Sequence, residues 1–73
     1  MINLPFGGID VGSLSAEAVI VDKGQIVTYV ILPTGSNSKA AAERAMSEAL
    51  QASGLAKADL KYVIATGYGR VSI

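Results

Sequence analysis

Three consecutive apolar segments with short connections constrain the fold of this chain more than any other feature. The segments span about residues 6–12, 16–22 and 25–32, and the third is dense in β-branched residues and is followed by Pro33. Such segments favour β-strands, because branched side chains pack well on a pleated sheet. Asp22-Lys23-Gly24 is typical of a tight turn, and short connections join antiparallel neighbours. The order therefore predicts an antiparallel meander.

A single amphipathic helix is predicted next, over about residues 38–53. Small and apolar side chains recur there at the spacing of one helix face. They are Ala42, Ala45, Met46, Ala49, Leu50 and Ser53. Asn37 or Ser36 can cap the start of the helix, and Gly54 can end it in the left-handed conformation. Because most of the stripe is alanine, the helix has to lie close to the layer that it covers.

A fourth strand is predicted at about residues 61–66, and it completes a β-β-β-α-β order. A helical crossover usually returns the chain to a parallel neighbour with right-handed topology. The fourth strand would then lie beside the first, in a mixed α/β sheet of spatial order 3-2-1-4. The C-terminal ends of these two strands would meet at one edge, which is where open α/β sheets bind ligands.

The strands are apolar on both faces, which is typical of sheets that are covered on both sides. We expect one face to carry Ile9, Val11, Val19, Val21, Val27, Tyr29 and Ile31, and the other to carry Phe6, Ala18, Ile20, Ile26, Val30 and Leu32. One helix covers one face only. An apolar face would therefore remain exposed and would favour self-association.

Length and composition limit the classes of function. Seventy-three residues form at most one domain, and the formal charge is zero, with six basic and six acidic residues. The charges form no basic patch, which argues against a nucleic-acid partner. The sequence has no cysteine and no histidine, and no apolar run approaches the ~20 residues of a membrane-spanning helix. We therefore expect a cytoplasmic protein without a nucleic-acid or membrane partner.

The candidate functional motif is Asp10-Val11-Gly12-Ser13-Leu14-Ser15, between the first two strands. Glycine lets the backbone approach an anion closely, and successive N–H groups in a turn attract phosphate oxygens. The serine hydroxyls add donors. The Asp10 carboxylate supplies the oxygen that Mg²⁺ prefers, directly or through water. The pattern predicts a phosphate and magnesium site, and an ordinary hairpin turn is the alternative, because Asp, Gly and Ser are common in turns.

Two motifs carry a resemblance to a known family. Gly8-Ile9-Asp10-Val11-Gly12-Ser13, followed by two strands, resembles the first phosphate motif of the actin/hexokinase/heat-shock-chaperone ATPase superfamily. Ala65-Thr66-Gly67-Tyr68-Gly69-Arg70 resembles more narrowly the ATP-dependent activators of 2-hydroxyacyl-CoA dehydratases and the related ATPase subunits of benzoyl-CoA reductase. The resemblance covers residues 7–73. It implies half of a ribonuclease-H-like, actin-like ATPase fold, with ATP in the cleft between two such domains.

The resemblance also implies roles for individual residues. Asp10 would hold the Mg²⁺ shell and the attacking water. The ATP phosphates would contact Gly12, Ser13, Leu14 and Ser15, through the backbone N–H groups of Gly12 and Leu14. Gly67 and Arg70 would line the cleft. Arg70 would steady the charge of the transition state, and a surface arginine is the alternative.

Activators of this family are homodimers that share one 4Fe–4S cluster, and ATP hydrolysis drives a low-potential electron into a partner dehydratase or reductase. This chain has no cysteine to hold such a cluster. We therefore expect residues 1–73 to be an N-terminal fragment that is inactive by itself. Two alternatives are a sugar or acetate-type kinase of the same superfamily and a non-enzymatic interaction module.

Overall fold

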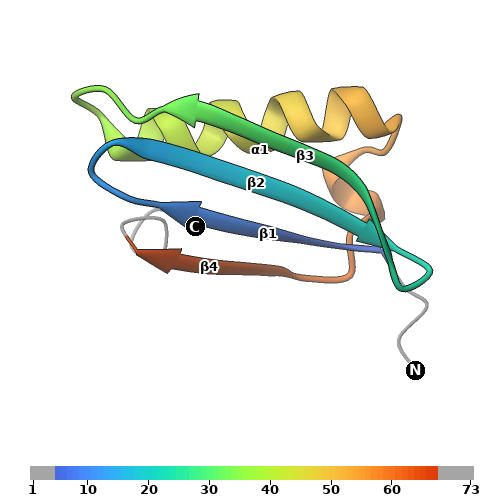
Figure 1. Ribbon diagram of the computed structural model, residues 1–73. Helices are drawn as coiled ribbons and strands as arrows, with labels where there is room; N and C mark the ends of the chain where they lie inside the picture. Colours follow the sequence, from blue (N-terminus) through green and yellow to red (C-terminus); the bar gives the residue numbers. More distant parts are fainter. Residues whose placement is uncertain (1–4, 68–73) are drawn as a thin grey trace.

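The fold is a four-stranded mixed sheet with one helix packed on it (Figure 1). The computed structural model describes residues 5–67. The elements are β1 (Phe6–Val11), β2 (Ser15–Asp22), β3 (Gln25–Pro33), α1 (Ser38–Ser53), the short 3-10 helix η1 (Lys57–Asp59) and β4 (Val63–Gly67). The strand order is β3-β2-β1-β4, with β1 and β4 parallel and the other pairs antiparallel. The predicted β-β-β-α-β order and the 3-2-1-4 sheet are confirmed.

The predicted boundaries of α1 are also confirmed, because local capping signals set them. The Asn37 side chain accepts a hydrogen bond of 3.0 Å from the Ala40 N–H at the start of the helix. Gly54 ends the helix with a φ of 78°, and its N–H donates to the Leu50 carbonyl. Both contacts satisfy backbone groups that a helix terminus leaves unpaired.

Strand boundaries shift by one or two residues from the prediction. β1 ends at Val11 rather than at residue 12, β2 begins at Ser15 rather than at 16, and β3 extends through Pro33. β4 begins at Val63 rather than at residue 61. The Lys61 N–H donates to the Pro5 carbonyl at 2.8 Å. The Gly7 N–H donates to the Tyr62 carbonyl at 3.1 Å rather than to the Lys61 carbonyl, and the regular parallel β1–β4 ladder starts at Gly7 and Val63.

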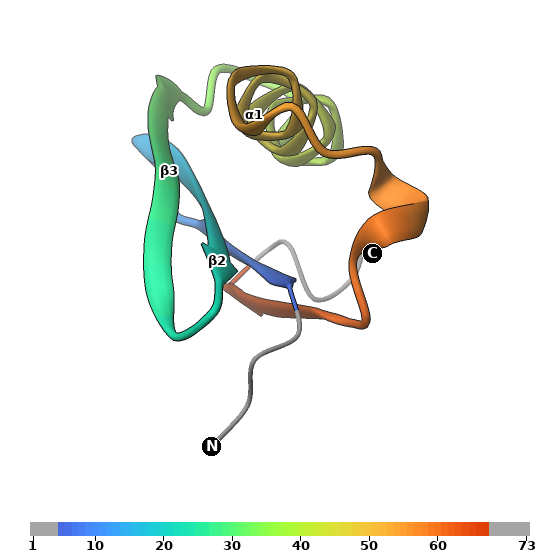
Figure 2. The ribbon, with the colours of Figure 1, turned by 90° about the vertical axis from the view of Figure 1, so that its right-hand side faces the viewer.

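The core lies between α1 and one face of the sheet. Four alanines of the helix are fully buried, and they are Ala41, Ala42, Ala45 and Ala49. They pack on Ile9, Val11, Ala16, Ala18 and Ile20 from β1 and β2, which expose 3% or less of their surface. The helix lies close to the sheet, as the alanine stripe predicted. Figure 2 shows this layer of helix on one side of the curved sheet.

The predicted assignment of the β1 side chains to the two faces of the sheet was wrong, for Phe6 as well as for Ile9 and Val11. Ile9 and Val11 were expected on the face of Val19 and Tyr29, but they lie under α1. The cause is the register of the β1–β2 hairpin, in which Ile9 pairs with Ala18 and Val11 pairs with Ala16. A change of one residue in register moves a whole strand to the opposite face. Since both faces of these strands are apolar, the sequence pattern could not select the register.

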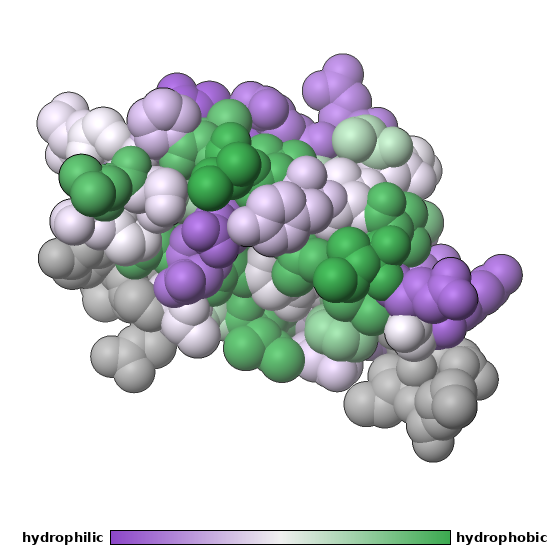
Figure 3. Space-filling model, viewed as in Figure 1, coloured by the Kyte–Doolittle hydropathy of each residue, from purple (hydrophilic) through white to green (hydrophobic). Residues whose placement is uncertain are grey.

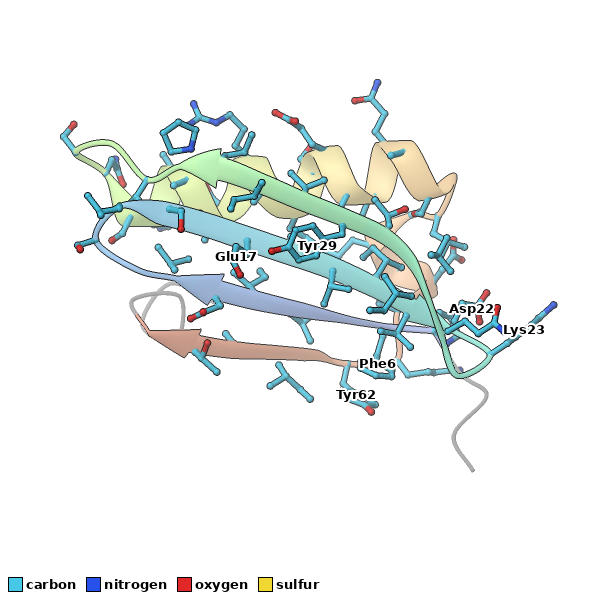
Figure 4. The ribbon with its side chains drawn as sticks, in the orientation of Figure 1. Phe6, Glu17, Asp22, Lys23, Tyr29 and Tyr62 are labelled. Carbon is cyan, nitrogen blue, oxygen red and sulfur yellow. The ribbon has the colours of Figure 1, made fainter. Side chains whose placement is uncertain are left out.

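The opposite face of the sheet is open in the part of the chain that the structure describes. Large apolar side chains on it remain exposed, including Tyr29 at 58%, Ile31 at 57% and Ile64 at 53%. Figure 3 shows apolar side chains distributed across this face. Phe6 and Tyr62 stack at one end of it, with ring centroids 5.0 Å apart (Figure 4). The predicted exposed apolar face is therefore present.

A second incompletely covered region lies beside the helix. A groove of about 370 Å³ runs between α1, η1 and the β1–β4 side of the sheet, with Met46, Leu50 and Leu55 among its apolar lining. Within residues 5–67, no helix combines the length and the apolar character needed to cross a bilayer.

Candidate nucleotide-phosphate site

The candidate motif forms the connection between β1 and β2. Gly12, Ser13 and Leu14 lie between the two strands and are exposed, Leu14 at 85%. The Gly12 N–H donates to the Ser15 carbonyl oxygen at 2.9 Å and closes the turn. The Gly12 N–H is therefore engaged within the protein. The expected contacts of the Gly12 and Leu14 N–H groups with phosphate both stay predictions.

Neither the backbone conformation nor the packing of the turn requires glycine at position 12. Its φ is not in the positive region, unlike that of Gly24, Gly35 and Gly54. A Cβ added at Gly12 would meet only the Ser15 carbonyl oxygen, at 3.7 Å, which is an ordinary contact. The absence of a side chain instead leaves open surface beside the turn. This surface fits the close approach of an anion to the backbone.

Thr34 holds the turn from the side of β3. Its hydroxyl donates to the Gly12 carbonyl at 2.8 Å, and its backbone N–H donates to the Leu14 carbonyl at 3.0 Å. The residue is 5% exposed. Sequence reasoning missed Thr34, because the contact joins residues 22 positions apart. The only signal was a polar residue directly after a strand that pairs with β2.

Asp10 lies near the C-terminal end of β1, on the open face of the sheet. Its carboxylate is exposed, and the residues opposite it are Glu17 on β2 and Thr66 on β4. The Thr66 hydroxyl donates to Asp10 Oδ1 at 2.7 Å. Thr66 was part of a quoted motif but was given no role in the sequence analysis. The parallel pairing of β1 and β4 brings the two residues together from 56 positions apart.

A shallow hollow of about 220 Å³ lies beside Asp10. Its polar lining comes from Asp10, Glu17, Tyr29 and Thr66. Figure 4 shows Tyr29 on β3 extending toward Glu17 on β2. Loss of water around the Tyr29 hydroxyl, followed by the negative charges of Glu17 and Asp10, raises the pKa of Tyr29 above its ordinary value of 10.0. The open face next to the turn is therefore acidic.

The predicted approach of β4 to the turn is confirmed as far as Gly67. Gly67 ends β4 and lies opposite Val11 in the parallel ladder, one residue before Gly12. Arg70 lies outside the described residues. Its predicted role therefore stays a prediction.

The donor set around Asp10 fits Mg²⁺ rather than a dedicated protein metal cage. Within residues 5–67, no group of three or more acidic or other metal-ligating side chains could hold an ion. Mg²⁺ commonly binds through one or two carboxylates and takes its remaining ligands from water and substrate phosphates. One exposed carboxylate beside a phosphate-accessible turn is compatible with that mode of binding.

Comparison with known proteins identifies the family. Residues 8–73 match the sequence profile of the BadF/BadG/BcrA/BcrD ATPase family. The chain belongs to this family. It is 47% identical over 64 residues to the activator of lactoyl-CoA dehydratase from Anaerotignum propionicum, covering 86% of this chain and 24% of that protein. It is 37% identical over 67 residues to the (R)-2-hydroxyglutaryl-CoA dehydratase activating ATPase of Acidaminococcus fermentans, covering 90% and 25%.

Solved structures agree with this membership in the ATPase family. Component A of the Acidaminococcus fermentans (R)-2-hydroxyglutaryl-CoA dehydratase matches with a TM-score of 0.83 and 34% identity, over 94% of this chain and 27% of that chain. The activator of the 2-hydroxyisocaproyl-CoA dehydratase from Clostridium difficile, solved with bound ADPNP, matches with a TM-score of 0.82 and 31% identity, over 96% and 26%. The predicted actin-like ATPase fold is confirmed, and the chain spans about a quarter of the length of these relatives. Membership in this family favours the ATPase interpretation over the kinase and interaction-module alternatives.

Proposed function

We propose that this chain forms the N-terminal phosphate-binding part of an ATP-dependent activator of a 2-hydroxyacyl-CoA dehydratase. The observation that carries the proposal is the placement of Asp10 beside an exposed turn. Neither the backbone conformation nor the packing of this turn requires glycine at position 12. Membership in an ATPase family supports nucleotide as the ligand. The names of the relatives support a CoA dehydratase as the partner.

In this proposal each part of the site has a distinct task. Asp10 is the catalytic carboxylate, which orients the attacking water and the Mg²⁺ shell. Gly12, Ser13, Leu14 and Ser15 contact the ATP phosphates through backbone N–H and hydroxyl groups, while Thr34 keeps the turn in place. Mg²⁺, when bound, offsets the charge that develops on the phosphates. Gly67 and Arg70 line the same cleft.

The redox part of the proposed activity lies outside these residues. Iron–sulfur clusters are held by cysteine thiolates, and this sequence contains no cysteine. A 4Fe–4S cluster shared by a homodimer, and electron transfer to a dehydratase or to benzoyl-CoA reductase, therefore require polypeptide other than this chain. Because the expected ATP site is a cleft between two domains, we also propose that the 73 residues alone are inactive.

The experiment is an ATPase assay on the complete native polypeptide that carries this sequence. Asp10→Asn should lower the turnover number by about 10²–10⁴-fold, as commonly found when a positioned acid or base is lost. Asp22→Asn is the matched control. It makes the same change at the end of β2 that lies away from the β1–β2 turn. Activation of a 2-hydroxyacyl-CoA dehydratase is measured in parallel. Unchanged ATP turnover in Asp10→Asn would refute the assignment of Asp10.

A further inference from the structure

The Asp10 carboxylate is held from the neighbouring strand by one side chain. Thr66 lies opposite Asp10 in the parallel β1–β4 ladder, and its hydroxyl is 2.7 Å from Asp10 Oδ1. We propose that Thr66 is a positioning residue, which fixes the orientation of the Asp10 carboxylate for ATP hydrolysis. The inference rests on the proposed function, since it assigns Thr66 a task in the same site.

The geometry shows which acceptor receives the Thr66 proton. A hydroxyl has one proton to donate. The Ile9 carbonyl oxygen is 3.4 Å from Thr66 Oγ1, whereas Asp10 Oδ1 is 2.7 Å away. The shorter distance is typical of a hydroxyl that donates to an ionised carboxylate. The hydroxyl therefore binds the Asp10 side chain rather than the backbone.

This bond matters because the Asp10 carboxylate has little other restraint. The residue is exposed, and exposed side chains exchange between χ1 rotamers within picoseconds to nanoseconds. The terminal torsion of an aspartate is in addition broad and roughly two-fold. A threonine on a strand has a restricted χ1 angle, so its hydroxyl is held ready for the contact. Engagement of Oδ1 fixes the carboxylate plane and leaves Oδ2 for a water molecule. Small errors in the position of such a group lower reaction rates strongly.

The contact contributes little to holding the sheet together. Backbone pairing joins β1 and β4 from Gly7 and Val63 to Val11 and Gly67. Thr66 itself is exposed on the open face. Removal of its hydroxyl therefore leaves the ladder intact. A kinetic effect would then report on Asp10 rather than on folding.

The kinetic test compares Thr66→Val, which removes the hydroxyl at similar volume, with Thr66→Ser, which keeps it. In the complete native polypeptide, Thr66→Val should lower kcat for ATP hydrolysis about tenfold to a hundredfold, the range for a hydrogen bond to a charged group. The KM for Mg-ATP should change by less than about threefold, because the interaction acts in the transition state. Thr66→Ser should keep most of the wild-type kcat. Thr28→Val on β3 is the matched control and should behave as wild type.

A second measurement is independent of catalysis. Three-bond NMR couplings to Asp10 Cγ in the complete native polypeptide report the χ1 populations of Asp10. We expect one dominant rotamer in the wild type and in Thr66→Ser, and averaged couplings in Thr66→Val. Averaged couplings in the wild type, or wild-type kcat in Thr66→Val, would overturn the proposal. A complete polypeptide that has a fixed Asp10 rotamer but no ATPase activity would overturn the proposed function. The contact between Thr66 and Asp10 would then stand, but its role in positioning Asp10 for ATP hydrolysis would not.

Discussion

Gly12→Ala is expected to weaken nucleotide binding without destabilising the protein. The φ of Gly12 lies outside the positive region, and an added Cβ would be 3.7 Å from the Ser15 carbonyl oxygen. Alanine at such a position restricts the unfolded chain, which stabilises a protein by about 0.4–1 kcal/mol. The free energy of unfolding should therefore stay equal or rise by up to that amount.

The same methyl group would occupy the exposed surface that we assign to the approach of ATP. A cost of about 1.4 kcal/mol on the bound state raises Kd tenfold. We therefore expect the Kd for Mg-ADPNP to rise at least about tenfold in the complete native polypeptide. Gly54→Ala is the control, because its φ of 78° makes alanine unfavourable by about 1–2 kcal/mol. That variant should lose stability and keep its affinity.

Stability is measured by urea unfolding followed by circular dichroism, and affinity by isothermal titration calorimetry. The two glycines should give opposite results in the two assays. A loss of more than about 1 kcal/mol in Gly12→Ala would show that its backbone does need glycine. An unchanged Kd would refute the ligand-facing role of this position.

Three further predictions concern Thr34, the open sheet face and Tyr29. Thr34→Val should destabilise the chain by about 1–3 kcal/mol, because it leaves the Gly12 carbonyl without its 2.8 Å donor; urea unfolding against Thr34→Ser tests this. The 73-residue chain should self-associate through its open face, and Ile31→Lys should shift sedimentation equilibrium toward the monomer, whereas a concentration-independent wild-type monomer would contradict this. Because the pKa of Tyr29 is raised in the folded protein, the phenol loses its proton at a lower pH in the unfolded chain than in the folded one. The free energy of unfolding should therefore fall as the pH rises through about 10 and should not change with this group well below that pH. Glu17→Gln should reduce this loss, and unfolding at two alkaline pH values measures it.

The sequence predicted those parts of the fold that depend on local signals. Asn37 and Gly54 fixed the ends of α1 because a side-chain cap and a left-handed glycine act within one helical turn. The strand order followed from connection lengths, since a helical crossover leads to a parallel neighbour. The face of Ile9 and Val11 could not be derived, because it depends on a hairpin register that two apolar faces leave undetermined.

In the candidate site, too, the residues of a contiguous motif could be predicted, whereas those that depend on strand pairing could not. Asp10 and the following turn were visible as a contiguous motif, and they remain the candidate ligand-binding residues. Thr34 and Thr66 became visible only after pairing brought them to residues 22 and 56 positions away. Their task depends on register rather than on local sequence. A threonine at the end of a strand is otherwise indistinguishable from an ordinary β-former.

The close contact between α1 and the sheet also limits how this protein can evolve. The separation of the two layers is set by side chains of minimal size, with four fully buried alanines on the helix. At Gly7 a methyl group would come within 2.9 Å of Met46 Cε, the end of a flexible side chain that would have to move. A larger residue at any of the four alanine positions would push the helix outward together with the segment that carries Thr34. Evolution should therefore constrain the volume of the side chains between α1 and the sheet, although they lie far from the turn. A larger residue on one side of this interface should be accompanied by a smaller residue on the other side.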